Sequence, residues 1–220
     1  MRRLTIRLKT LGLATVGWSH PGTVKADIMF ARRYRYDGTY TVYIPGTSFK
    51  GALRSSASRI AEAYGFTSCG ETLVRHAHQT SGEVGFETCA VCHLFGYPGR
   101  GPSKILVDDL IPLENRNVDI YKVTHVGLDD TTLTRAEHKL YTVEVIPPHT
   151  IFEGSIEVDD SVSGGGVKLL MISLAELRLG RFGKNAAVDL KVVEGFDQLV
   201  GILGPEEARR FEGLGEWLWG

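Results

Sequence analysis

Three cysteines and several histidines gather in an irregular stretch of the chain, residues 66–102, whose side chains suit a bound metal ion. Cys89 and Cys92 form a C-x-x-C pair, which presents two thiolates from a single turn. A structural zinc ion takes four such ligands in a tetrahedron, and the set that we predict is Cys69, His76, Cys89 and Cys92. His78 is an equal candidate for the place given to His76. A closed site of this kind would stabilise an insertion that has little apolar core of its own.

Two other interpretations of the cysteines stay open. A C-x-x-C pair also forms redox-active disulfides, although no strand–helix pattern typical of thioredoxin-like proteins precedes this one. The cysteines are otherwise ordinary buried side chains without a ligand. Three is an odd count for a disulfide scaffold, and the chain opens with Met1-Arg2-Arg3 rather than an apolar signal. We therefore expect a reducing, cytoplasmic location, and no run of about 20 apolar residues predicts a membrane span.

A second group of residues suited to chemistry lies on a predicted helix. Apolar residues keep a 3.6-residue period from Phe49 to Tyr64, with Thr47 or Ser48 as the N-cap and Gly65 as the C-terminal stop. Lys50 and Arg54 are four residues apart, so we expect them on one exposed face near the helix N-terminus. Cations are poorly placed at the positive end of the helix dipole unless an anion lies between them and the first-turn amides. The simpler alternative is a solvated polar face.

The charge of the chain is balanced overall but segregated along the sequence. Its 220 residues include 25 basic and 26 acidic side chains, and 43% of them are hydrophobic, which predicts one soluble domain with a packed core. Residues 25–59 hold seven basic residues against two acidic ones, and residues 194–220 hold six acidic against two basic. Such blocks are compatible with one cationic surface for phosphates, or with surface charges that cluster by chance.

The order of predicted elements favours an α+β fold. We expect residues 1–193 to form one domain and the acidic residues 194–220 to pack on it or on a neighbour. Residues 114–139 are polar and long enough for an insertion or an extended hairpin. The remaining order, strand, helix, strand and then strand, helix, strand, is that of the ferredoxin-like split βαβ. The predicted elements are strands at 4–11, 104–113, 140–146, 150–158 and 186–193, helices at 47–64 and 164–179, and a hairpin at 34–44.

Four strings of residues resemble one protein family. Residues 44–54 read IPGTSFKGALR and resemble the IPGSSLKGALR signature of the RAMP superfamily. The run from Cys89 to Gly96 resembles the family's CxxCxLFG, residues 140–147 with Phe152 resemble its return strand, and residues 179–184 resemble its late glycine-rich loop. The chain is thus similar to the repeated, target-cleaving RNA-binding backbone subunit of type III-A-like CRISPR effector complexes.

This resemblance implies a fold, partners and functional residues. The fold would be a modified ferredoxin-like (RRM-like) domain with a zinc-stabilised insertion at 66–102 and a long thumb hairpin within 114–140. The partners would be CRISPR RNA, complementary target RNA, other effector subunits and further copies of the chain. Asp27 would cleave target RNA with Mg2+ or another divalent cation. The residues that would contact RNA are Lys25, Arg32, Arg33, Ser48, Lys50, Arg54, Gly180, Arg181 and Gly183.

Three functional hypotheses follow. In the first, the chain binds guide RNA and Asp27 cuts target RNA, whose own 2′-OH attacks in line with the scissile phosphate. A single aspartate argues against a two-metal nuclease and for a slow, geometry-driven cut. In the second, the chain is a structural subunit that binds RNA without cutting. In the third, it is a stand-alone endoribonuclease that processes precursor RNA with His20.

Overall fold

The computed structural model describes most of the chain. The described residues are 1–18, 26–34, 36, 38–70, 88–97, 102–113, 118–128, 135–184 and 186–217. None of the helices in these ranges is long and apolar enough to cross a membrane.

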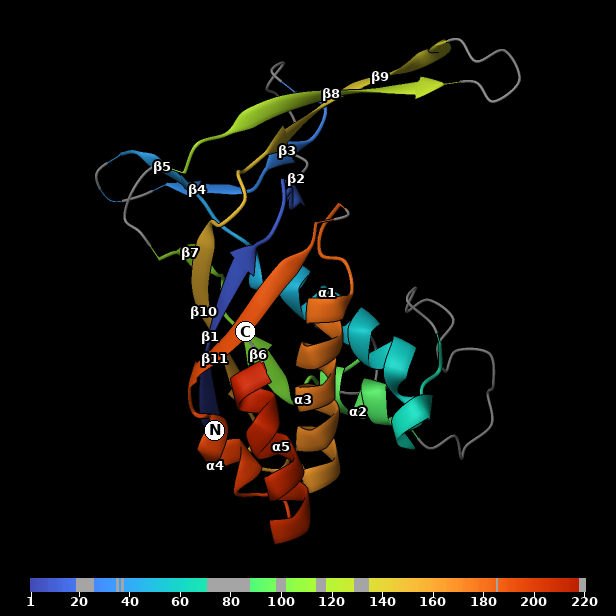
Figure 1. Cartoon of the computed structure of the whole chain (residues 1–220), viewed down its shortest axis with the longest axis vertical. Coiled ribbons are helices and arrows are strands. Elements are labelled where there is room, and N and C mark those ends of the chain that lie inside the picture. The colour runs from blue at the N-terminus through green and yellow to red at the C-terminus, as the bar shows by residue number, and fades with distance from the viewer. Residues whose placement is uncertain are drawn as a thin grey trace.

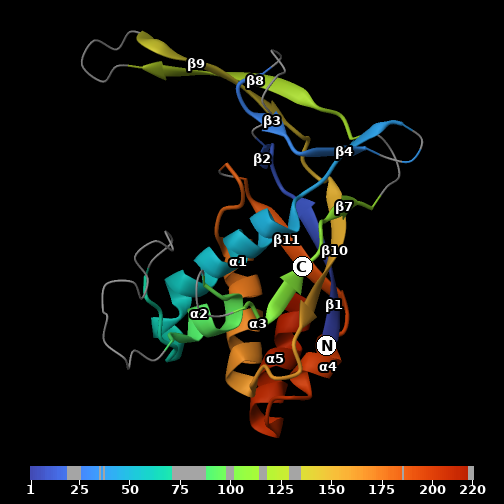
Figure 2. The same cartoon turned by 180° about the vertical axis from the view of Figure 1, so that it is seen from behind.

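The body of the molecule is built on an antiparallel sheet. Its strands are ordered β11 (Val188–Glu194), β1 (Arg2–Thr10), β10 (Ile151–Val158) and β6 (Ile105–Val107), and β7 (Ile111–Pro112) continues beside β10. Helices α1 (Gly46–Ile60) and α3 (Gly164–Leu179) lie together against it (Figures 1 and 2). The chain order β1, α1, β6, β10, α3, β11 gives the strand order of the split βαβ. The fold is therefore α+β, as the sequence predicts.

Alternation along the strands separates a core face from a charged face. Leu4, Ile6 and Leu8 of β1 are buried under the helices, where each contributes about 1.5–3 kcal/mol by leaving water. The intervening residues lie on the open face beside a hollow of about 810 Å³. Acids of neighbouring strands and loops pair with the cations on this face. Arg7 lies 2.8 Å from Glu153, for example.

The strand expected at 104–113 is interrupted, and the interruption explains how α1 begins. Asp108 and Asp109 lie between β6 and β7, and Oδ1 of Asp109 accepts the backbone N–H of Gly46 at 2.9 Å. The N-cap is Pro45, which makes no side-chain cap, so the prediction of Thr47 or Ser48 as N-cap was wrong. The carboxylate of Asp109 takes over that role from 63 residues away, a distance at which periodicity carries no information.

A long hairpin projects from one end of the body (Figure 1). Its strands are β8 (Tyr121–Leu128) and β9 (Arg135–Val145), paired from Tyr121 opposite Val145 outward. The return strand β9 therefore includes most of the run that the sequence assigns to a separate strand at 140–146. Short strands surround the root of the hairpin: β2 (Gly17–Trp18), β3 (Met29–Phe30), β4 (Arg32–Tyr34) and β5 (Tyr40–Val42).

A buried carboxylate fixes the hairpin to these short strands. The Glu144 residue of β9 is 3% exposed, and its Oε2 accepts the backbone N–H of Phe30 at 3.1 Å. Both of its oxygens also accept from the guanidinium of Arg32, at 2.9 Å each. One side chain thus joins β9 to β3 and β4, and we call this contact the neck.

The remaining helices complete the body. The 3-10 helix Glu62–Tyr64 extends α1 to Gly65, whose φ of 76° gives the left-handed stop that the sequence predicts. Helix α2 (Ala90–Phe95) packs beside α1, and α4 (Phe196–Val200) and α5 (Pro205–Trp217) follow β11. The acidic C-terminal segment packs on its own chain, because Leu199 and Leu203 are buried and Glu207 pairs with Lys168 of α3 at 3.1 Å.

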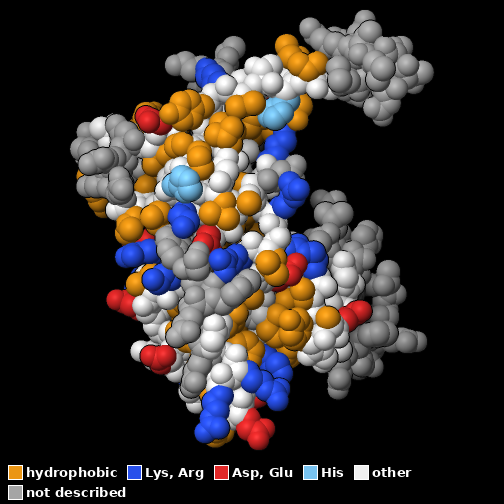
Figure 3. Space-filling model, in the orientation of Figure 1, with side chains coloured by type: hydrophobic (Ala, Val, Ile, Leu, Met, Phe, Trp, Pro, Cys, Tyr) orange, Lys and Arg blue, Asp and Glu red, His pale blue; other side chains and the backbone are white. Residues whose placement is uncertain are grey.

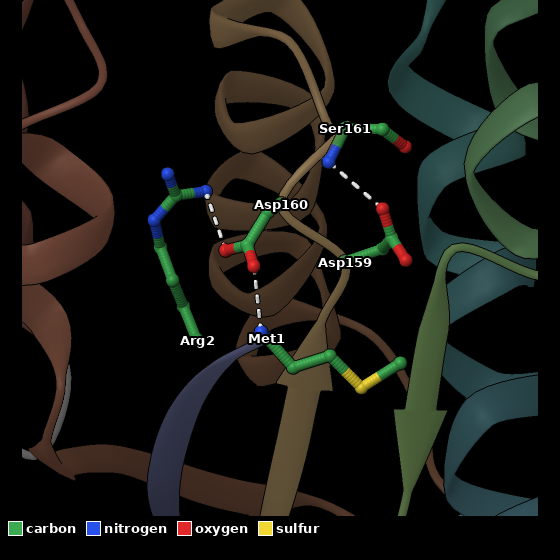
Figure 4. A network of polar contacts seen from close by, with 5 residues as sticks. All are labelled: Met1, Arg2, Asp159, Asp160 and Ser161. Carbon is green, nitrogen blue, oxygen red and sulfur yellow. Dashed lines mark hydrogen bonds and ion pairs between the residues drawn. The ribbon is translucent and has the colours of Figure 1, made fainter.

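The N-terminus is tied to the turn before α3 (Figure 4). The amino group of Met1 lies 2.7 Å from the Asp160 carboxylate, and Arg2 reaches the same carboxylate at 3.6 Å. The hydrogen bond from the terminal ammonium holds the pKa of Asp160 below its usual value. The carboxylate of Asp159 accepts the backbone N–H of Ser161 at 2.8 Å, so one aspartate binds within the turn and the next binds the N-terminus.

The neck predicts that alanine at Glu144 destabilises the protein more than alanine at Glu153. Glu144→Ala leaves a buried N–H and a guanidinium without an acceptor, so we expect the free energy of unfolding to fall by about 3 kcal/mol. Glu153→Ala breaks an ion pair whose side chains are both 35% exposed, and we expect a loss below about 1 kcal/mol. Urea unfolding of both variants measures the difference, and equal losses would contradict the role given to the neck.

Candidate nucleic-acid interface and metal centre

The three cysteines converge at the start of α2. The sulfur atoms of Cys69, Cys89 and Cys92 all lie within 4.8 Å of one another, with 3.6 Å between Cys69 and Cys92. Cys89 is the N-cap of α2, and its sulfur accepts the backbone N–H of Cys92 at 3.4 Å. Sulfur ligands about 2.3 Å from a tetrahedral zinc ion lie roughly 3.8 Å apart. The arrangement therefore fits three ligands of one zinc ion.

The surroundings of the sulfurs determine the protonation of Cys92. Burial is the main cause that raises the pKa of Cys92 to about 12, and the neighbouring thiols raise it further, whereas Arg54 acts in the opposite direction. Without a metal ion this thiol is protonated at neutral pH. A zinc ion would displace the proton and hold the thiolate. His76 and His78, the two candidates for the fourth ligand, lie outside the described residues, and His93 of α2 is exposed and outside the cluster.

Lys50 and Arg54 are not on a freely solvated face, contrary to the sequence prediction. Helix α2 packs beside α1, and Arg54 donates to the carbonyl of Gly96 and to the sulfur of Cys92, the latter at 3.1 Å. Lys50 donates to the carbonyl of Ile105 at 3.2 Å. Burial lowers the pKa of the Lys50 amine, and the charge of Arg54 lowers it further. Both cations are half-buried, and no carboxylate among the described residues pairs with either of them.

The N-terminal amides of α1 are largely occupied. Asp109 accepts the N–H of Gly46, and the carbonyl of Pro45 accepts those of Ser48 and Phe49. The anion that the sequence places at this end of the helix is thus Asp109, which satisfies the helix dipole. A phosphate held by Lys50 and Arg54 would depend on their side chains and not on these amides.

A glycine on the same helix leaves open space. Gly51 is exposed, and a Cβ added there would meet no atom within 4 Å, so the packing of the chain does not require a glycine. Glycine inside a helix costs about 1 kcal/mol relative to alanine. Gly46 differs, because its Cβ would lie 2.1 Å from the carbonyl oxygen of Val107. Gly46 allows the close contact between α1 and β6, whereas no contact within the described part of the chain requires a glycine at position 51.

The residues predicted to act with Asp27 differ in their surroundings. The Asp27 carboxylate is exposed at the edge of β9, where Oδ2 accepts the backbone N–H of Thr142 at 2.6 Å. Arg32 is committed to Glu144 in the neck, while Arg33 is exposed on β4. Lys25 and His20 lie outside the described residues.

The glycine-rich loop at 180–184 uses its glycines for contacts within the chain. Gly183 has a φ of 55°, and its Cβ would lie 2.2 Å from the carbonyl oxygen of Thr15. A Cβ on Gly180 would lie 2.7 Å from the guanidinium of Arg59. At these two positions the loop lies close to its own body, and its contact with RNA stays a prediction. Arg181 is exposed.

Sequence reasoning missed a cleft of about 260 Å³ between the root of the hairpin and the body. His125 and Tyr141 face each other across the hairpin with their rings stacked, 5.1 Å apart at 18°. The ammonium of Lys184 lies 4.1 Å from the centre of the Tyr141 ring. Thr15 completes the lining from the body. Four segments distant in sequence supply these residues, so no local spacing could have identified the cleft.

Comparison with known proteins identifies the family. The sequence model described as "RAMPs: RAMP superfamily" matches residues 20–187. The chain belongs to the RAMP superfamily. In fold it resembles a chain of a solved structure titled "Type IV-B CRISPR Complex", with a TM-score of 0.61 and 16% sequence identity, over 87% of this chain and 91% of that one. No curated protein matches. The solved complex is of type IV-B, whereas the motifs in the sequence resemble type III proteins.

The cysteine cluster predicts one tightly bound zinc ion per chain. We expect elemental analysis of the purified protein to find it, and Cys89→Ser to lose it because three ligands hold zinc far less tightly than four. His76→Ala and His78→Ala identify the fourth ligand, since only one of them should release the metal. His93→Ala is the matched control and should retain it. Zinc that stays bound to Cys89→Ser would contradict the site.

The two glycines of α1 predict opposite effects of alanine on stability. Gly46→Ala forces β6 away from the helix, and we expect a loss of at least about 2 kcal/mol in the free energy of unfolding. Gly51→Ala meets open space and should raise it by up to about 1 kcal/mol. Thermal or urea unfolding compares them, and a destabilising Gly51→Ala would show that the chain itself needs this glycine.

Proposed function

We propose that this chain is a structural, CRISPR-RNA-binding backbone subunit of a CRISPR effector complex. The observation that carries the proposal is membership of the RAMP superfamily across residues 20–187, on a fold similar to a chain of a type IV-B CRISPR complex. Its partners would be the guide RNA, the complementary target RNA, further copies of the chain and other effector subunits. The motif resemblance to type III subunits supports the same role.

The shape and charge of the molecule support RNA binding. The hairpin extends beyond the body on one side (Figures 1 and 2). Lysine and arginine side chains form a band across the middle of the molecule, below the hairpin (Figure 3). Lys50 and Arg54 are half-buried, pair with no carboxylate of the described residues, and would gain from a nearby phosphate. Gly51 offers the space through which a backbone would approach them.

Cleavage by Asp27 is the second candidate function. The Asp27 carboxylate is exposed beside the hairpin, which favours cleavage. A divalent cation such as Mg2+ would then assist the cut. The surroundings favour a role as scaffold. One oxygen of Asp27 already accepts the N–H of Thr142, and Arg32 is paired with Glu144. Of the cations predicted to act with Asp27, Arg33 is the described one that is exposed. The hypothesis of a stand-alone nuclease depends on His20, which lies outside the described residues.

The experiment for RNA binding uses two alanine variants that should both fold well. Gly51→Ala fills the open space on α1, and we expect it to weaken binding of guide RNA roughly tenfold, which corresponds to about 1.4 kcal/mol. Gly213→Ala is the matched control, because Gly213 is also an exposed helical glycine with nothing within 4 Å. It should leave binding unchanged. Failure of the wild-type chain to bind guide RNA in filter binding would overturn the proposal.

The second measurement decides between scaffold and nuclease. The assembled complex is incubated with guide-complementary RNA in magnesium or in chelator, with wild-type chain or Asp27→Asn. We expect the same products from both, because this chain does not cut. A ladder of regularly spaced products that appears with wild type and disappears with Asp27→Asn, while RNA binding is unchanged, would establish Asp27 as the cleaving residue instead.

A further inference from the structure

The cleft at the root of the hairpin has the composition of a nucleotide site. The hairpin supplies Val123, His125 and Tyr141 to its lining, and the body supplies Leu13, Thr15 and Lys184. Its volume of about 260 Å³ lies just below the usual range for small-molecule pockets, which is reasonable for one unit of a polymer. It is therefore an apolar and aromatic cleft with a small number of polar groups at its rim.

The aromatic pair offers a stacking surface. His125 and Tyr141 are opposite each other on β8 and β9, which fixes their rings nearly parallel, at 18°. His125 is exposed and Tyr141 is half-buried, so the pair is open to solvent on one side. Proteins that bind single-stranded nucleic acid stack bases on such side chains, with little preference among bases.

The polar groups match the other parts of a nucleotide. Lys184 brings a positive charge to the cleft through its contact with the Tyr141 ring. The loop that carries it is held in place by the N–H of Lys184, which donates to the carbonyl of Thr15 at 3.2 Å. The exposed position of this lysine leaves its ammonium accessible to a phosphate.

Thr15 provides an independent sign of a ligand. Thr15 is one of the residues that line the cleft, it is 3% exposed, and its buried hydroxyl has no hydrogen-bond partner among the described residues. Buried hydroxyl groups in proteins almost always have a partner. A ligand that fills the cleft would supply one.

We propose that this cleft binds one nucleotide of a single-stranded RNA, a subsite of the guide-RNA binding proposed above and dependent on it. The base packs against His125 and Tyr141, the phosphate contacts Lys184, and the Thr15 hydroxyl bonds to a polar group of the nucleotide. Tyr141 precedes Thr142, whose N–H holds Asp27, so the bound nucleotide lies next to the edge of β9 that carries Asp27. The cleft thus sets the path of the RNA at the root of the hairpin.

The test uses the full chain with a single-stranded oligouridylate that carries photoreactive 4-thiouridine. We expect crosslinked peptides from β8 and β9 at the cleft. Tyr141→Leu keeps the apolar bulk but removes the stacking surface, and should weaken binding about tenfold with an unchanged salt dependence. Lys184→Gln removes one phosphate contact, and should lower the slope of log affinity against log salt by about 0.7. The matched controls Tyr121→Leu, exposed on the same hairpin, and Lys191→Gln, exposed on β11, should leave both quantities unchanged.

The outcomes separate this inference from the function on which it rests. RNA that binds tightly to the chain, crosslinks elsewhere and is insensitive to Tyr141→Leu and Lys184→Gln would overturn the cleft and leave the function standing. No RNA binding by the wild type would overturn both. If the two variants instead lose self-assembly, measured by light scattering, while RNA binding is intact, the cleft is a protein interface and the nucleotide site is wrong.

Discussion

The arrangement of the hairpin relative to the body depends on one buried carboxylate. Glu144 binds the backbone of Phe30 and the guanidinium of Arg32 from inside β9, so the strand that leaves the hairpin is fixed before it enters the body. A carboxylate this deeply buried is stable only when its oxygens are satisfied, which makes the contact specific for one register. The cleft lies on the opposite face of the same strand, formed by Tyr141 and Val143. The neck therefore determines where the aromatic pair meets the body.

A second chain of contacts joins the cysteine cluster to α1. Arg54 reaches from the helix to Cys92 and to the carbonyl of Gly96, at the two ends of α2. A zinc ion on the three sulfurs would fix the turn that begins α2, and through Arg54 would fix the face of α1 that carries Lys50. Second-shell contacts of this kind orient metal ligands and are oriented by them. The cysteine cluster and the face of α1 that carries Lys50 are thus joined through Arg54.

Local features of the sequence predicted the elements, and long-range contacts decided the details. The helix at 164–179 has the predicted bounds because its apolar period and its Ser163 cap are local. The order of strands and helices indicated the split βαβ. In contrast, the cap of α1 by Asp109, the commitment of Arg32 to Glu144 and the close contact of Gly183 with Thr15 join residues far apart in the chain. Three of the residues predicted to contact RNA, Arg32, Gly180 and Gly183, therefore also have contacts within the protein, and their contact with RNA stays a prediction.

A guide-RNA scaffold protects the RNA that it binds, so the protected RNA tests whether this RAMP protein is one. The chain would be expressed with the other subunits and a CRISPR array, purified, treated with ribonuclease, and the surviving RNA sequenced. We expect protected fragments that consist of guide sequences and end at regular intervals, as a row of identical subunits would produce. Protected RNA drawn at random from cellular transcripts, or no protected RNA, would contradict it.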